Sequence, residues 1–251
     1  MLNFDPNMPA FFLYYEKGEL VGLLTVYADD PDVEVAILVH PNHRCQGIAR
    51  ALYRSFEKET ASYPIESVTF QTERIFLERH PDFASNWGLV EDEETETWLG
   101  KDRRPYPLAN VSNLEVLLAD CSYQDQISQL KFHAFSEDHE SREVVDRYVA
   151  KALKDPESLL YILLKNGQVI GTCTVDLSTN TNYFYGLAIS EPERGKGYGS
   201  YLAKSLVNQL IEQNDKKFQI AVEDSNVGAK RLYEKIGFVK QTQVVYLKPT
   251  V

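Results

Sequence analysis

The chain has 251 residues, of which 43% are apolar and 25% are charged, and its net charge is −11. These proportions are typical of a folded globular protein, and no apolar run approaches the roughly 18 residues that suggest a membrane span. The acidic charge disfavours partners such as nucleic acid or an anionic membrane. The first ten residues lack the basic start and apolar core of a secretory signal, so a cytoplasmic protein is expected.

Three scattered cysteines are too few for a disulfide framework, and no Cys-x-x-Cys or His-x-x-x-His spacing is present. We therefore expect reduced thiols and no metal site. Cys173 lies in an apolar stretch, Val169–Val175, which favours a small buried residue over a nucleophile.

The two halves of the chain repeat one pattern. Arg194–Gly199 reads Arg-Gly-Lys-Gly-Tyr-Gly, and Arg44–Ala49 is a weaker copy of it. Other residues recur 149 residues later, among them Gly18 as Gly167, Gly22 as Gly171 and Gly88 as Gly237. A repeat of this length indicates two copies of one domain. We predict one domain at 1–100, a linker at 101–112 and a second domain at 113–251.

In the first half, apolar and β-branched runs predict strands at Phe11–Tyr15, Leu20–Tyr27, Val33–Val39, Ile65–Gln71 and Gly88–Leu99. The turn Glu16–Glu19 joins the first two strands as a hairpin. A helix is expected over Gly47–Glu57, where apolar residues recur at helical spacing. A short irregular segment is expected before Gly88, and the polar, proline-containing stretch from Gly100 to Asn113 is the predicted linker.

The second half opens with a segment that has no counterpart in the first: a strand at Leu114–Ala119, a helix at Tyr123–Phe135, a loop at Ser136–Glu140 and a helix at Ser141–Lys154. The repeat then resumes with strands at Leu159–Lys165, Gln168–Val175 and Asn182–Ile189, a helix at Tyr198–Glu212, a strand at Lys217–Val222, a helix at Val227–Ile236 and a strand at Val239–Leu247. The predicted fold class is α/β (α+β), with a mixed, mostly antiparallel sheet flanked by helices in each half.

The loop Arg194–Gly199 has the chemistry of an anion site. Gly195, Gly197 and Gly199 leave the backbone unshielded where a strand passes into a helix, so that amide groups and the helix dipole can meet a pyrophosphate. It is not a nucleoside triphosphate loop, because Lys196 is followed by glycine rather than serine or threonine.

Two ordered motifs, Ile189–Gly199 and Asn226–Phe238, together resemble the paired signature of the GNAT acyltransferase superfamily. The resemblance covers most of 113–251 and part of 11–99, so it implies a catalytic domain at 113–251 and a truncated, degenerate copy at 1–100. It implies an acetyl-CoA-dependent N-acetyltransferase that transfers an acetyl group to a primary amine by direct attack. The residues implied to bind the coenzyme are Leu187, Ala188, Ile189, Arg194, Gly195, Lys196, Gly197, Tyr198, Gly199 and Asn226. The backbone amide of Ile189 would polarise the thioester carbonyl, and the Asn226 side chain suits a helix cap as well as a cofactor contact.

In the same resemblance Tyr233 is the acid that protonates the departing thiolate, although a core tyrosine is the alternative. The general base is open. Tyr185 stands where many relatives have a glutamate, and Glu223 and Asp224 are the nearest acidic substitutes along the chain. Other candidates flank the loop between the first two helices of the second half, namely His133, Glu137, Asp138, His139 and Glu140, and a water-relayed base is a further alternative.

The first half has Cys45 and Ile48 within its copy of the loop, Ala84 at the tyrosine position, and Arg74 or a neighbour at the asparagine position. We therefore expect a structural or degenerate domain there. The acceptor would be a small-molecule or peptide amine, and the protein a monomer with an internal pseudo-dimer or a homodimer. The alternative is a non-catalytic acyl-CoA-binding or scaffold protein.

Overall fold

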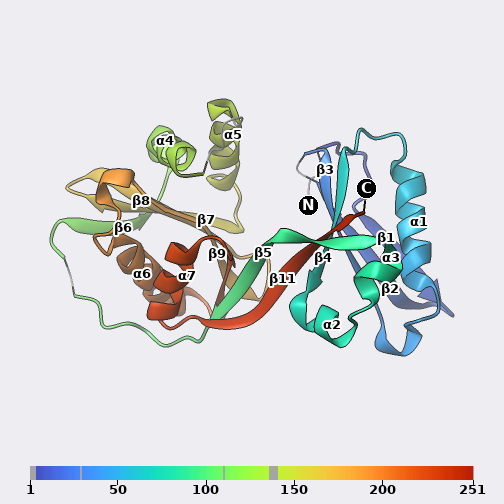
Figure 1. Ribbon diagram of the computed structural model, residues 1–251. Coiled ribbons are helices and arrows are strands. Elements are labelled where there is room, and N and C mark those ends of the chain that lie inside the picture. The colour runs from blue at the N-terminus through green and yellow to red at the C-terminus, as the bar shows by residue number, and fades with distance from the viewer. Residues whose placement is uncertain (1–3, 29, 110, 136–140, 251) are drawn as a thin grey trace. The chain divides into compact units, whose positions relative to one another are not determined.

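The computed structural model describes residues 4–28, 30–109, 111–135 and 141–250. The chain forms two compact units: unit 1 comprises Met1–Glu96 and Thr242–Val251, and unit 2 comprises Thr97–Gln241. Each unit has a sheet flanked by helices (Figure 1). The mixed α/β class expected from the sequence is confirmed.

Unit 1 has the strand order β1-β2-β3-β4-β11-β5. The strands are β1 (Phe11–Glu16), β2 (Glu19–Tyr27), β3 (Asp32–Val39), β4 (Ser67–Glu73), β5 (Leu89–Lys101) and β11 (Val239–Pro249). The first three pair antiparallel, whereas β3 and β4 run parallel. The β1–β2 turn places Lys17 and Gly18 at positive φ, as the predicted hairpin requires.

One face of this sheet is covered by α1 (Ile48–Thr60). Ile48, Leu52 and Phe56 recur every four residues on the helix, and all three are buried. They pack in a core cluster with Leu24, Val26, Val33 and Val35. The expected helix after the loop is thus confirmed.

Unit 2 has the strand order β5-β10-β9-β8-β7-β6. Its further strands are β6 (Leu114–Leu118), β7 (Ser158–Lys165), β8 (Gln168–Asp176), β9 (Thr181–Ile189) and β10 (Lys217–Glu223). The helices are α4 (Gln124–Phe135), α5 (Arg142–Ala152), α6 (Tyr198–Gln213) and α7 (Val227–Lys235). All lie within a few residues of the predicted bounds.

The helices of unit 2 cover both faces of its sheet, with α4 and α5 on one face and α6 and α7 on the other (Figure 1). On the first face Ile127, Val145 and Val149 pack with strand residues Leu160, Ile162 and Leu164. On the second, Leu202, Leu206 and Leu210 of α6 pack with Phe184, Phe218 and Tyr233. Unit 2 therefore has three layers, with its sheet between two pairs of helices.

Two features of unit 1 differ from the sequence expectation. The segment expected to be irregular contains two short helices, α2 (Arg74–Arg79) and α3 (Phe83–Trp87). Neither is long enough to show a helical period in the sequence. In addition, the end of β11 belongs to unit 1 rather than to the second half, because Val244–Leu247 pairs antiparallel with Phe70–Glu73 of β4.

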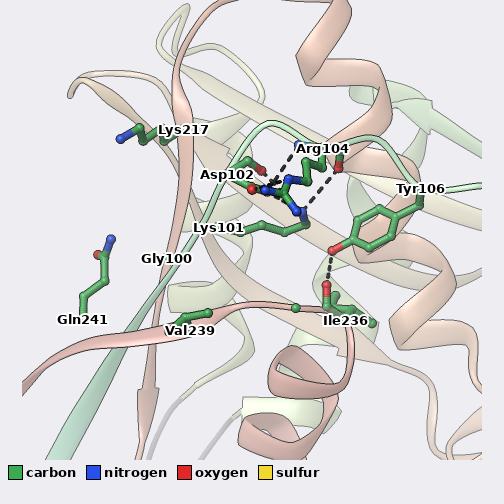
Figure 2. A pocket seen from close by; sticks show the side chains of 10 residues that line it. Gly100, Lys101, Asp102, Arg104, Tyr106, Lys217, Ile236, Val239 and Gln241 are labelled. Carbon is green, nitrogen blue, oxygen red and sulfur yellow. Dashed lines mark hydrogen bonds and ion pairs between the residues drawn. The ribbon is translucent and has the colours of Figure 1, made fainter.

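The stretch after β5 belongs to unit 2 and is bonded to α6 and to the residue that follows α7. Asn208 of α6 bonds both the backbone N–H and the carbonyl oxygen of Tyr106, and the Tyr106 hydroxyl donates to the carbonyl oxygen of Ile236 (Figure 2). Lys101, at the end of β5, donates to Asp102 Oδ1 at 3.1 Å and lies 4.8 Å from the Tyr106 ring centroid. This segment is irregular but anchored by side chains.

Candidate active site

The glycine loop has the predicted strand-to-helix position. A single 3-10 turn, Glu191–Glu193, leads from β9 into it, and Gly197 caps α6 with φ 85°. A Cβ atom built on Gly195 or Gly197 meets no atom within 4 Å. The first amide groups of α6 have no partner within the helix, so the loop offers donors beside open space, as an anion site needs.

Charged side chains brace the loop. Arg194 Nε donates to the carbonyl oxygen of Ile189 at 3.0 Å, which fixes the loop to the end of β9. Glu193 binds Lys165 at 2.9 Å and Lys196 at 3.2 Å. The Lys165 hydrogen bond lowers the pKa of Glu193, and Glu193 raises the pKa of Lys165. The charge of Lys196, within the loop, is therefore partly balanced by Glu193.

Strands β9 and β10 part just before the predicted pantetheine segment. Their parallel pairing runs from Thr181–Lys217 to Phe184–Ile220 and ends there. Leu187, Ala188 and Ile189 follow on β9 beyond that point. The diverging strands leave backbone donors and acceptors of β9 without a neighbouring strand on that side, which suits hydrogen bonding to an extended amide-bearing arm.

A β-bulge lies at the same place. Thr174 pairs with Tyr185 and Thr172 with Ala188, so Gly186 and Leu187 together oppose Cys173. Gly186 has φ 59°. Unit 1 has no such irregularity, since β2 and β3 pair without a shift from Gly22–Val39 to Tyr27–Glu34. The extra residue accounts for the change of the repeat offset from 149 before β9 to 150 at the loop.

Three of the predicted elements converge at Gly199. A Cβ atom built there would lie 2.9 Å from Leu232 of α7, 3.7 Å from Ile189 and 3.8 Å from Leu187. Glycine at this position lets the first turn of α6 approach β9 and α7 closely. The structure therefore brings the loop, the strand end and the helix that carries Tyr233 into one site.

Tyr233 is 3% exposed, and its ring contacts Phe238. Burial, with a smaller contribution from Cys173, raises its pKa well above 10.0. The phenol thus stays protonated at neutral pH and retains a proton to donate. Cys173 is fully buried, and burial raises its pKa to about 12, which fits the small buried residue predicted rather than a nucleophile.

Asn226 caps α7, because its Oδ1 accepts a hydrogen bond from Ala229 N at 3.0 Å. The capping role expected from the sequence is therefore present. Glu223 ends β10 and is exposed, with Ser225 Oγ at 3.4 Å from its carboxylate. Asp224 instead bonds Lys230 Nζ and Thr97 Oγ1, each at 2.6 Å, so of the two acids Glu223 is the more available.

Sequence reasoning missed Lys131. This α4 residue donates to Thr174 Oγ1 at 3.1 Å and lies 5.8 Å from the Tyr185 ring centroid. Its Nζ is 2.9 Å from where a Cβ of Gly186 would be. Burial lowers its pKa, and the nearby Cys173 partly offsets this. An isolated lysine in an amphipathic helix carries no signal in the sequence, since only the fold brings it to the bulge.

Tyr185 belongs to a row of aromatic rings on the sheet face that bears α4. It stacks on Tyr183 at 6.2 Å between ring centroids, and Tyr183 stacks on Trp98 at 5.7 Å. Burial raises the pKa of Tyr185. Of the other base candidates, His133 is exposed in the last turn of α4, whereas Glu137, Asp138, His139 and Glu140 lie outside the described residues.

Unit 1 keeps the backbone of the loop without its full chemistry. Arg44 Nε donates to the carbonyl oxygen of Val39 at 3.1 Å, as Arg194 does to Ile189, and Gly47 has φ 83°. Cys45, in place of Gly195, is held at φ 60°. Ala84 lies in α3 at the tyrosine position, and Arg74 begins α2, where it binds Glu91 at 2.6 Å.

A hollow of about 610 Å³ lies elsewhere in unit 2, beside Lys101, Arg104, Tyr106 and Lys217 (Figure 2). Lys217 starts β10, whereas the candidate site is at the other end of that strand, roughly 20 Å away at about 3.3 Å per residue. The hollow is thus separate from the candidate site. Across the described ranges of the chain, no group of three or more His, Cys, Asp or Glu side chains is placed to hold a metal ion.

The acetyltransferase (GNAT) family model matches residues 2–79 and 124–238. These segments cover well over half of the chain, so the chain belongs to the acetyltransferase (GNAT) family and is an acyltransferase. The two matched segments also confirm a tandem arrangement of GNAT domains. Within the described part of the chain, no helix has the length and apolar character needed to cross a membrane.

Among curated proteins, the chain is 26% identical over 230 residues to a mycothiol acetyltransferase of Clavibacter sepedonicus, covering 87% of this chain and 73% of that one. It is 25% identical over 92 residues to the N-alpha-acetyltransferase MAK3 of Arabidopsis thaliana, covering 35% of this chain and 48% of that one. These relatives support acetyl transfer as the general activity.

Solved structures share the fold. A tandem GNAT protein from the clavulanic acid biosynthesis pathway superposes with a TM-score of 0.71 at 17% identity, over 95% of this chain and 83% of that one. A GCN5-related N-acetyltransferase from Sphaerobacter thermophilus superposes with a TM-score of 0.69 at 18% identity, over 93% of this chain and 79% of that one.

Proposed function

We propose that the protein is an acetyl-CoA-dependent N-acetyltransferase whose catalytic domain is the second half of the chain, 113–251. The observation that carries the assignment is the β9 bulge. It occurs in unit 2 and has no counterpart in the β2–β3 pairing of unit 1. It lies where β9 and β10 part and next to the glycine loop, so one site combines an anion cradle with free strand backbone.

The residues of this site fit coenzyme A. The open space beside Gly195 and Gly197, with the amide groups at the start of α6, suits the pyrophosphate. Leu187, Ala188 and Ile189 suit the pantetheine arm, because extended backbone pairs with amides. Acetyl-CoA would supply the thioester whose acetyl group is transferred. The further contacts proposed are Arg194, Lys196, Tyr198, Gly199 and Asn226.

In the proposed reaction, a neutral primary amine attacks the thioester carbonyl carbon directly. The Ile189 amide donates to the carbonyl oxygen as negative charge develops there. The carbon–sulfur bond breaks, and Tyr233 gives its hydroxyl proton to the departing sulfur. The nitrogen, which has gained a bond to carbon, gives up its extra proton, and this restores the neutral phenol and leaves the amide and the free thiol as products. The phenol is suited to this because burial keeps it protonated before the sulfur leaves.

An amine has an unperturbed pKa of about 10 and must lose a proton before it attacks. We propose the Glu223 carboxylate as the general base that accepts this proton, through a water molecule between the amine and the carboxylate. Glu223 is exposed at the end of β10, next to the parted strands, whereas Asp224 is held by Lys230. The acceptor is proposed to be a small-molecule or peptide amine, and the cytoplasmic location expected from the sequence stays a prediction.

The test is a panel of small amines and N-terminal peptides incubated with acetyl-CoA, with release of the free thiol as the signal. Gly197→Glu places a carboxylate in the anion cradle and should abolish release. Gly47→Glu makes the same change at the matching position of unit 1 and should leave release unchanged. If Gly47→Glu rather than Gly197→Glu abolishes release, the site is in the other half. Thioester binding without release for any amine would favour a non-catalytic acyl-CoA-binding protein.

A further inference from the structure

Unit 1 has an uncovered apolar sheet face. Phe11, Leu13 and Tyr15 alternate along β1, and each is at least 50% exposed. Register places them beside β2, where Tyr15 pairs with Leu20 and Leu13 with Leu23, and Leu23 pairs in turn with Leu38 of β3. Leu20 and Leu38 are also about half or more exposed. These five exposed residues, Phe11, Leu13, Tyr15, Leu20 and Leu38, form what we call the apolar face.

The repeat supplies an internal control. The residues 149 positions after Phe11, Leu13 and Tyr15 are Leu160, Ile162 and Leu164. Those three are at most 6% exposed, because α4 and α5 lie over them. Among its described residues, unit 1 has no counterpart of α4 and α5, yet it keeps large apolar and aromatic side chains at the same positions. A sheet face exposed to water normally carries polar residues.

The size of the face is that of an interface. A large apolar or aromatic side chain presents on the order of 150–250 Å², so five half-exposed ones expose about 500 Å², and the atoms between them add to this. The largest apolar patch on a typical monomer is about 300–600 Å² and is often functional, so this face is in the range of a functional patch. A stable protein–protein interface buries about 800 Å² on each partner. The face therefore approaches what one side of a stable dimer needs.

From this geometry we infer that the apolar face of unit 1 is a homodimer interface, on which the same face of a second copy packs. A twofold axis lets one surface serve both partners, so the pair closes without any other molecule. The chain carries a net charge of −11, which opposes association elsewhere, while the five residues of the face are uncharged. Sheets packed face to face interdigitate such side chains in a single apolar layer.

The test is sedimentation equilibrium of the full chain from micromolar concentration upward. The wild type is expected to form a dimer. Leu13→Lys should weaken the dimer at least about tenfold, because it places a charge at the centre of the face. The matched control is Leu118→Lys on β6 of unit 2, where the leucine is 52% exposed against 50% for Leu13. This control should remain dimeric.

Circular dichroism establishes that each variant is folded, and Leu38→Lys replaces Leu13→Lys if the latter is not. Loss of the dimer in the face variants, with retention in the control, supports the inference. A monomeric wild type overturns it. A dimer that persists in both Leu13→Lys and Leu38→Lys overturns it as well, since association then uses another surface, such as the edge of β1.

Discussion

At the scale of single residues, Tyr233 is the proposed general acid of the reaction. Tyr233→Phe removes only the hydroxyl from a buried ring, so coenzyme binding should be retained while kcat falls about 10²-fold. Acetyl-CoA titration and steady-state kinetics on the same samples separate the two effects. An unchanged kcat would rule out the acid role.

The raised pKa of Tyr233 also predicts how kcat depends on pH. Its pKa is raised well above 10.0, so the neutral, proton-donating form persists throughout the neutral and mildly alkaline range. The wild-type kcat should therefore show no loss attributable to this phenol below pH 10. A decline near pH 8 that disappears in Tyr233→Phe would contradict the assignment.

Cys45 of unit 1 stands at the position of Gly195 and has a strained backbone. It is held at φ 60°, a conformation that costs a residue with a side chain about 1–2 kcal/mol. Cys45→Gly relieves this cost and loses about 0.5–1 kcal/mol through the freer unfolded chain. A net stabilisation of unit 1 by about 0.5–1 kcal/mol is expected in denaturant titrations of the full chain. Destabilisation would mean that the cysteine side chain makes a compensating contact.

At the scale of elements, the β9 bulge is expected to depend on Gly186. A Cβ there would lie 2.9 Å from Lys131 Nζ, and φ 59° disfavours any side chain. Gly186→Ala should cost about 1–2 kcal/mol in the free energy of unfolding. Adding Lys131→Ala removes the close contact but not the backbone strain, so it should recover only part of the loss. Full recovery would show that the backbone is unstrained.

The control for that variant is Gly228→Ala. Gly228 lies within α7 and has no positive φ, and its added Cβ would be 3.8 Å from Asn226 Oδ1, an ordinary contact distance. Alanine is preferred to glycine inside a helix by roughly 0.5–1 kcal/mol, so this change should be neutral or stabilising. Opposite signs for the two glycine variants are therefore expected from chemical denaturation.

Most elements were predictable from sequence because their side chains are periodic. Alternation along β1 and β2 and the four-residue recurrence in α1 each reflect one buried face. The helices α2 and α3 were not predictable, since five or six residues make too few turns. The loop Arg194–Gly199 and Tyr233 were proposed as site residues from the paired motifs, and this assignment stays a prediction. Lys131 was not, because its place at the bulge depends on tertiary packing.

At the scale of the whole molecule, the C-terminal end of the chain completes the fold of unit 1. Val245 and Leu247 of β11 are fully buried in the core cluster of unit 1, although they lie at the far end of the sequence. No local pattern distinguishes a strand that completes its own domain from one that completes another, which is why the division at 101–112 did not reveal it.

This arrangement predicts the effect of Val245→Asp. An unpaired carboxylate in that core should unfold unit 1 selectively, since buried charge without a partner costs several kcal/mol. Hydrogen exchange should then show loss of protection in β1 to β4, with protection retained in β7 to β9. Lys248→Ala, on the same strand but exposed, is the control. Equal loss of protection in both units would contradict the assignment of β11 to unit 1.

A calorimetric titration of the wild type with acetyl-CoA tests whether the second half of the chain binds the coenzyme. One site per chain is expected, abolished by Gly197→Glu and unaffected by Gly47→Glu, because the β9 bulge has no counterpart in the β2–β3 pairing and Cys45 stands at the position of Gly195. Absence of binding would contradict the proposed function. Two sites per chain, or a site lost with Gly47→Glu, would contradict the placement of the chemistry in the second half.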